Sequence, residues 1–250
     1  VWDNWGVDNG VWDIGAPLTG PATNSAGYRT HEGTNCAATV LAGNYPVSTS
    51  SRLIRITPFV VPSASQSPRL EFWHWYAFSG DSYGVVQIKY GTNNWADLSP
   101  RYYATGCGVW TRPVVDLKAY AGKAVQIAFR IAADGSVNDG WNVDEVRVIK
   151  GDYTVGFTNG LTESFELGLG DWHAETGTWQ VGVPTSGPNA AHSGTNCLAT
   201  VLGANYEDDR SSRFISPSFV VPSADQLPRL RFWEWFSIGG HDYVQVQIKV

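Results

Sequence analysis

The chain has no methionine, three cysteines and few charged residues for its 250 residues. Charged residues make up 16% of it, against about 25% in a typical soluble domain. The net charge of −6 argues against nucleic acid as a partner, because binding phosphates requires a basic surface. No apolar run approaches the ~18 residues that a membrane-spanning helix needs. HExxH and CxxC motifs are absent, and no spacing singles out a set of Ser, His and Asp residues, so the sequence predicts no enzymatic activity.

Aromatic residues and turn formers are abundant instead, with 12 Trp, 27 Gly and 13 Pro. Val86 and Ile88 alternate with Gln87 and Lys89, and a similar alternation runs through 124–132. Such a period of two is typical of antiparallel strands with one face in a core. No segment shows a helical period. The sequence therefore predicts an all-β fold of antiparallel β-sandwich modules, of the jelly-roll type.

A domain-scale repeat organises the chain. FVVPSASQSPRLEFWHW (59–75) returns as FVVPSADQLPRLRFWEW (219–235), and THEGTNCAATVLAGNY (30–45) returns as AHSGTNCLATVLGANY (191–206). We expect two tandem modules, residues 1–152 and 153–250. The first has no counterpart of TESFE, and the second has no counterpart of the residues after Tyr90 in the first. The second module is thus expected to be truncated, with neighbouring copies or adjacent repeats completing both modules as a fibre or surface array.

The segment 68–89, PRLEFWHWYAFSGDSYGVVQIK, predicts two aromatic-rich strands joined by a short turn, which form the central sheet of the module. His74 is replaced by Glu234 in the second copy, which indicates a position that water can reach. Exposed rings beside polar groups would suit a sugar, whereas the alternative, which we favour for the Trp residues, is that they fill the core. The candidate ligand-binding residues are Trp73, His74, Trp75, Gln87, Lys89, Arg130, Trp233, Glu234 and Trp235.

The three cysteines leave two interpretations open. Cys36 and Cys197 are equivalent in the repeat, whereas Cys107 lies in a part that the second copy lacks. A Cys36–Cys107 disulfide would leave Cys197 unpaired. Alternatively, all three are small buried apolar residues.

Four segments together resemble a known family: HSGTNCLATVLGANY, RLRFWEW, GVWTRPVVDLKAYAGKAVQIAFR and DGWNVDEVRV. They resemble the MAM-like jelly-roll modules, of the choice-of-anchor J type, of bacterial secreted and surface proteins. The layout is also similar to that of jelly-roll carbohydrate-binding modules. The resemblance implies an extracellular or bacterial cell-surface location, and it says little of function because this fold carries many unrelated sites.

The resemblance also implies a structural Ca²⁺, held by Glu166 or Glu163, the loop 192–194 and Asp144. Carboxylate and carbonyl oxygens are the ligands that Ca²⁺ prefers. A second candidate ligand is Asp134, which opens a loop with spacing like that of an EF-hand. Asp139 stands where an EF-hand requires glycine, so a turn is the better explanation of that loop.

Three functions remain open on the sequence alone. The first is a non-catalytic structural or adhesive array, favoured by the tandem repeat and the low charge. The second is a pair of carbohydrate-binding modules, which depends on the Trp-rich strands. The third is an accessory region of a larger secreted peptidase or glycosidase.

Overall fold

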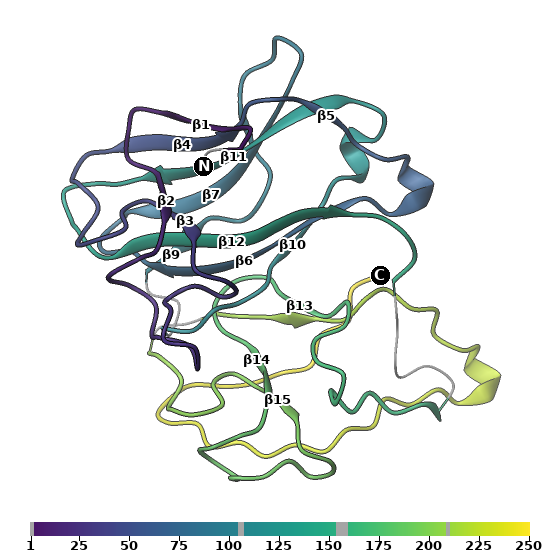
Figure 1. Ribbon diagram of the computed structural model, residues 1–250. Helices are drawn as coiled ribbons and strands as arrows, with labels where there is room; N and C mark the ends of the chain where they lie inside the picture. The colour runs from purple at the N-terminus through teal and green to yellow at the C-terminus, as the bar shows by residue number, and fades with distance from the viewer. Residues whose placement is uncertain (1–2, 105–107, 154–159, 209–210) are drawn as a thin grey trace.

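The computed structural model describes residues 3–104, 108–153, 160–208 and 211–250 (Figure 1). The chain is all-β, as predicted, and the strand pairs in these ranges are antiparallel. Short 3-10 turns occur at Ala64–Gln66, Lys118–Tyr120 and Ala224–Gln226. Across the described ranges, no helix has the length and apolar character needed to cross a membrane.

One layer of the first sandwich is a seven-stranded sheet. Its main path runs in the order β1-β4-β11-β7-β8, with β5 paired to β11 and β9 paired to β7. The strands are β1 (Trp5–Asp8), β4 (Ser50–Arg55), β5 (Phe59–Val60), β7 (Tyr83–Tyr90), β8 (Ala96–Asp97), β9 (Tyr102–Tyr103) and β11 (Ala124–Ala132).

The other layer is a five-stranded sheet in the order β10-β6-β12-β3-β2. Its strands are β2 (Asp13–Gly15), β3 (Cys36–Ala38), β6 (Arg69–Ala77), β10 (Val114–Asp116) and β12 (Gly140–Ile149). Figure 1 shows the two layers stacked face to face, with the second repeat beyond the five-stranded sheet.

An aromatic core lies between the sheets. Trp141 on β12 is fully buried, and its ring centroid lies 5.7 Å from that of Trp12 and 5.6 Å from that of Phe129. Gly84 on β7 faces Trp141 so closely that an added Cβ would lie 2.6 Å from the indole ring. The glycine therefore makes room for the largest side chain of the core. Val86 and Ile88 point into this core, which confirms the alternation predicted for β7.

The predicted pairing of the two strands in 68–89 is wrong. β6 pairs with β10 and β12, whereas β7 pairs with β11, β8 and β9 in the other sheet. The turn between them carries the chain from one layer to the other. A period of two identifies which face of a strand is apolar, but it does not identify the neighbouring strand.

β12 carries a bulge between Asp144 and Arg147, where its register with β6 shifts. Glu145 has a φ of 48°, in the left-handed region that L-residues rarely adopt. Val143 points into the core, and Val146 packs against it after the bulge. The extra residue places two consecutive carboxylates, Asp144 and Glu145, beside the same loop.

The second repeat contains two two-stranded ribbons, formed by β13 (His173–Ala174) with β16 (Phe214–Ile215) and by β14 (Gln180–Gly182) with β15 (Cys197–Ala199). Residues 228–250, which correspond to β6 and β7, have no strand assignment and are exposed, contrary to the strands expected there. In the first repeat both strands pair only with strands later in the chain, β8 to β12. Part of the predicted module boundary, 154–159, lies outside the described residues, and the boundary stays a prediction.

Candidate functional site

The predicted aromatic site on β6 is covered. Trp75 is 4% exposed, and Gly20 lies against its ring. Trp73 is half-buried beneath His31, whose ring is stacked on it at a centroid distance of 3.7 Å. Both Trp side chains point out of the sandwich, but a loop before β3 packs over them. The ring of Trp75 is therefore closed to a ligand, and His31 covers one face of Trp73.

The prediction that water reaches His74 is wrong, because the side chain is 2% exposed within the core. Trp141 Nε1 donates a hydrogen bond to His74 Nδ1 over 3.3 Å. Burial lowers the pKa of His74 to about 3, because a charged imidazolium would lose its hydration there. His74 is a neutral acceptor in the core and not a ligand contact.

The counterparts in the second repeat behave differently. Trp233 is 79% exposed, Trp235 is 57% exposed, and Glu234 is exposed. His192 stacks on Trp233 at a centroid distance of 4.0 Å, which reproduces the pairing of His31 with Trp73. The repeated His–Trp stack thus belongs to the way the loop lies on the Trp-containing segment in both copies.

The remaining predicted ligand residues lie on the other side of the molecule. Gln87 and Lys89 on β7 and Arg130 on β11 point outward from the seven-stranded sheet. The predicted set is therefore divided between two opposite faces, because β6 and β7 belong to different sheets. Sequence reasoning located three polar residues of this outer face but combined them with aromatic residues from the wrong layer.

Polar side chains form a hydrogen-bonded row across the outer face of the seven-stranded sheet. Arg52 Nη1 donates to Asp8 Oδ2 over 2.8 Å, and Arg52 Nε donates to Gln87 Oε1 over 2.8 Å. Gln87 Nε2 in turn donates to Asp97 Oδ1 over 2.7 Å. Arg52 and Gln87 are separated by β11, where the small side chain of Ala128 lies between their strands. The row therefore spans β1, β4, β7 and β8.

Aromatic rings lie beside this row. Trp95 precedes β8, and its ring centroid lies 5.8 Å from Arg52 Cζ and 5.8 Å from Lys89 Nζ. At the far end of the face, Tyr83 and Tyr103 are 5.4 Å apart between ring centroids. Arg130 Nη1 lies 3.4 Å from Tyr83 Oη.

We call the surface formed by this row and these rings the polar face, and most of its members are not among the residues predicted to bind a ligand. Trp95 lies in a stretch, NNWADL, where only a single Trp among polar residues could have drawn attention to it. The polar face comprises Asp8, Arg52, Tyr83, Gln87, Lys89, Trp95, Asp97, Arg101, Tyr103 and Arg130.

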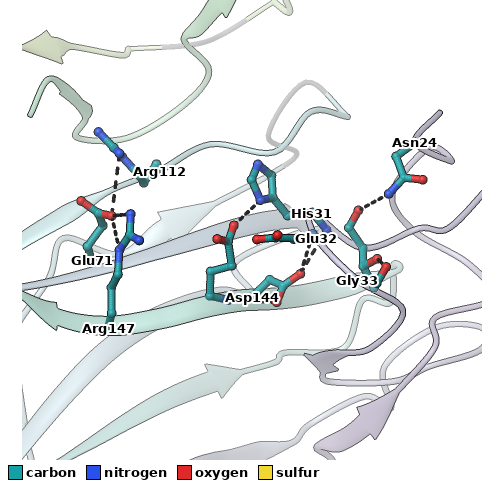
Figure 2. Close-up of polar contacts among 10 residues, drawn as sticks. Asn24, His31, Glu32, Gly33, Glu71, Arg112, Asp144 and Arg147 are labelled. Carbon is teal, nitrogen blue, oxygen red and sulfur yellow. Dashed lines mark hydrogen bonds and ion pairs between the residues drawn. The ribbon is translucent and has the colours of Figure 1, made fainter. Parts of the chain in front are cut away.

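Asp144 and Glu145 hold the loop that contains His31. Figure 2 shows Asp144 beside His31 and Glu32 of that loop. Asp144 Oδ2 accepts hydrogen bonds from the backbone N–H groups of His31 and Glu32, over 3.1 and 3.2 Å. Glu145 Oε2 pairs with His31 Nδ1. Burial raises the pKa of Asp144, although the backbone N–H groups oppose the rise.

The four carboxylates predicted to bind Ca²⁺ have other partners. Asp134 accepts from Asp81 N, Ser136 N and Ser82 Oγ, so it shapes a turn. Glu163 Oε1 accepts from Phe165 N, and Glu166 binds the loop 194–196 of its own repeat. Within the described residues no three His, Cys, Asp or Glu side chains gather as a metal site would require. The oxygens of Asp144 and Glu166 face N–H donors, which does not fit a cation, and structural Ca²⁺ stays a prediction.

Cys36 is a buried free thiol whose Sγ lies 3.7 Å from Asn142 Oδ1. Burial raises the pKa of Cys36 to about 12, so the thiol is protonated and unreactive at neutral pH. Cys107 lies outside the described residues. The Cys36–Cys107 disulfide therefore stays a prediction.

A buried carboxylate connects the repeats. Glu71 on β6 is 3% exposed and accepts a hydrogen bond from Arg147 Nε over 2.7 Å, with Arg112 Nη1 3.7 Å away (Figure 2). Arg112 also donates to the carbonyl of Trp172 over 2.9 Å. Burial lowers the pKa of Arg112, and the carboxylate of Glu71 opposes that shift. These contacts give the outer side of the five-stranded sheet a structural role.

No family model matches the chain, so its resemblance to MAM-like modules stays a prediction. Bacillopeptidase F of Bacillus subtilis (strain 168) is 34% identical over 141 residues, which cover 55% of this chain and 9% of that protein. The chain thus matches less than a tenth of that relative.

Similar solved structures include a CBM61 module in complex with β-1,4-galactotriose, at 14% identity and a TM-score of 0.39, covering 60% of this chain and 90% of that one. Another is the tandem CBM22 domain of Paenibacillus barcinonensis Xyn10C, at 14% identity and a TM-score of 0.40, covering 79% of this chain and 56% of that one.

Proposed function

We propose that the chain is a non-catalytic binding module whose polar face binds a polysaccharide outside the cell. The observation that carries this proposal is the hydrogen-bonded row from Asp8 to Asp97, with Trp95 beside it. Sugars present apolar ring faces that stack on aromatic side chains, and hydroxyl groups that need donors and acceptors in fixed positions. The polar face supplies both on one rigid sheet.

The row is preorganised. Arg52 is held by Asp8 on one side and by Gln87 on the other, and Gln87 is only 4% exposed. Because these side chains are already ordered before a ligand arrives, binding loses little further conformational entropy. The guanidinium of Arg52 and the carboxylate of Asp97 can each make hydrogen bonds in addition to those within the row.

The charge of the polar face favours an acidic sugar. Arg52, Lys89, Arg101 and Arg130 outnumber the carboxylates, Asp8 and Asp97, although the whole chain has a net charge of −6. We expect a polysaccharide that contains uronic acids to bind more tightly than its neutral analogue. Raising the salt concentration from 50 to about 500 mM should weaken that binding several-fold, because exposed charges are screened. Isothermal titration calorimetry with oligogalacturonate and galactan checks both expectations, and equal, salt-independent affinities would contradict the charge argument.

Replacing Trp95 with alanine should weaken polysaccharide binding about tenfold or more, because the ring loses its stacking contact with the sugar. Affinity electrophoresis in gels containing soluble acidic and neutral polysaccharides measures the change. Trp73→Ala is the matched control, since Trp73 lies under His31 on the opposite side of the sandwich. If Trp73→Ala abolished binding and Trp95→Ala did not, the site would be at β6 and the proposal would be wrong.

A second candidate function is that of an accessory region of a secreted peptidase. The 34% identity to part of Bacillopeptidase F favours it. The two proposals are compatible, because a peptidase can carry a module that holds it near a polysaccharide. The fibre or surface array expected from the tandem repeat stays a prediction.

A further inference from the structure

A cleft of about 400 Å³ opens between the two sheets of the first sandwich. Trp5, Leu53 and Phe59 line it from the seven-stranded sheet, and Val143 and Val146 line it from β12. Asn35, Arg55 and Glu145 are among the polar residues that line it. The cleft is separate from the polar face, because its walls are side chains that point between the sheets.

The second repeat shows which side chain the equivalent place accepts. Phe165 lies with its ring centroid 5.6 Å from that of Trp172 and 6.3 Å from that of Phe214. In the repeat, Trp172 corresponds to Trp5 and Phe214 corresponds to Leu53, and both counterparts line the cleft. A phenylalanine side chain placed between them would bury its ring in the first sandwich as Phe165 does in the second.

The residue after Phe165 makes a polar contact that also has a counterpart. Glu166 Oε1 accepts from the backbone N–H groups of Thr195 and Asn196, over 2.9 and 2.8 Å. Glu166 Oε2 accepts from Thr195 Oγ1 over 2.6 Å, and Asn196 Nδ2 donates to the carbonyl of Phe165 over 3.3 Å. These hydrogen bonds lower the pKa of Glu166.

The loop that would receive such a glutamate is repeated in the first sandwich. Thr34 and Asn35 correspond to Thr195 and Asn196, and Asn35 borders the cleft. Arg55 lines the cleft as well, and its buried Nε has no hydrogen-bond partner within the described part of the chain. A buried donor without an acceptor is costly, and a backbone carbonyl entering the cleft would satisfy it.

We propose that this cleft binds an extended peptide segment in which phenylalanine is followed by glutamate. The phenylalanine ring packs against Trp5 and Leu53. The glutamate carboxylate accepts hydrogen bonds from the loop at Thr34 and Asn35. Recognition thus requires an apolar ring and an adjacent carboxylate, the chemistry of Phe165 and Glu166.

A synthetic peptide with the sequence of 162–168, TESFELG, tests the proposal when it is fluorescently labelled and titrated with the 250-residue protein. We expect binding with one peptide per chain. Replacing its Phe with Ala should weaken binding about tenfold or more, because the buried ring is lost. Replacing its Glu with Gln should weaken binding about threefold or more, because charge-assisted hydrogen bonds are lost.

Matched protein variants locate the site. Thr34→Val should weaken peptide binding about threefold, because it removes one hydroxyl donor from an exposed loop residue. Thr195→Val, the same change in the second repeat, should leave binding unchanged, and so should Trp95→Ala on the polar face. The proposal is overturned if the peptide does not bind at millimolar concentration, if its Phe and Glu do not matter, or if Thr195→Val rather than Thr34→Val weakens binding.

Discussion

Replacing Trp141 with alanine is expected to lower the free energy of unfolding of the first sandwich by about 3–5 kcal/mol. The indole is fully buried, and its ring centroid lies 5.7 Å from that of Tyr102 and 5.6 Å from that of Phe129. The substitution leaves a large cavity between the sheets and also leaves His74 Nδ1 without its donor. Neighbouring strands cannot close that cavity, because the other packed side chains between the two sheets keep the sheets at a fixed distance.

Urea unfolding followed by circular dichroism measures this loss. Trp233→Ala is the matched control, because Trp233 is 79% exposed and its removal creates no cavity. The control should change the free energy of unfolding by less than about 1 kcal/mol. If Trp141→Ala were as mild as the control, the inferred position of the core would be wrong.

A second large effect concerns pH. The pKa of His74 is lowered to about 3 in the folded chain, whereas an unfolded histidine titrates near its ordinary value of 6.5. Between these values the unfolded chain takes up a proton and the folded chain does not. Acid therefore favours unfolding in this window, and stability falls as the pH is lowered from about 6.5 toward 3. The slope due to His74 approaches about 1.4 kcal/mol per pH unit.

The variant His74→Gln isolates this contribution, since glutamine does not titrate and can still accept from Trp141 Nε1. Urea midpoints measured between pH 7 and pH 4 should fall less steeply in His74→Gln than in the natural chain. Carboxylates that titrate in acid change the stability of both proteins equally, so their contribution cancels when the slope of one protein is subtracted from that of the other. Identical slopes for His74→Gln and the natural chain would show that His74 is hydrated.

The alternation of apolar and polar residues was sufficient to predict the fold class and to predict which face of an individual strand is buried. The alternation of Val86 and Ile88 with Gln87 and Lys89 separated core from surface on β7, because successive side chains of a strand point to opposite faces. The same reasoning does not hold for His74, because its replacement by Glu234 in the other repeat predicts a hydrated residue. In the structure a hydrogen bond from Trp141 satisfies the imidazole inside the core.

The candidate site depended on contacts that no local pattern contains. Gln87, Lys89 and Arg130 were identified, but Trp95 was not, because its position beside Arg52 results from pairing between β7 and β8. Trp73 and Trp75 were grouped with the polar residues, and the loop that covers them could not be foreseen. A loop's path over a sheet depends on distant contacts such as that between Asp144 and His31.

By itself, then, the sequence determined the repeat, the all-β class and the apolar face of the main strands. Each of these follows from the order and spacing of residue types along the chain. Only the tertiary structure decided that β6 and β7 enter different sheets, that β12 bulges at Asp144, and that a polar row crosses β1, β4, β7 and β8. Strand pairing joins residues far apart in the chain, and a period of two is compatible with any partner. The location of the proposed binding face follows from that pairing.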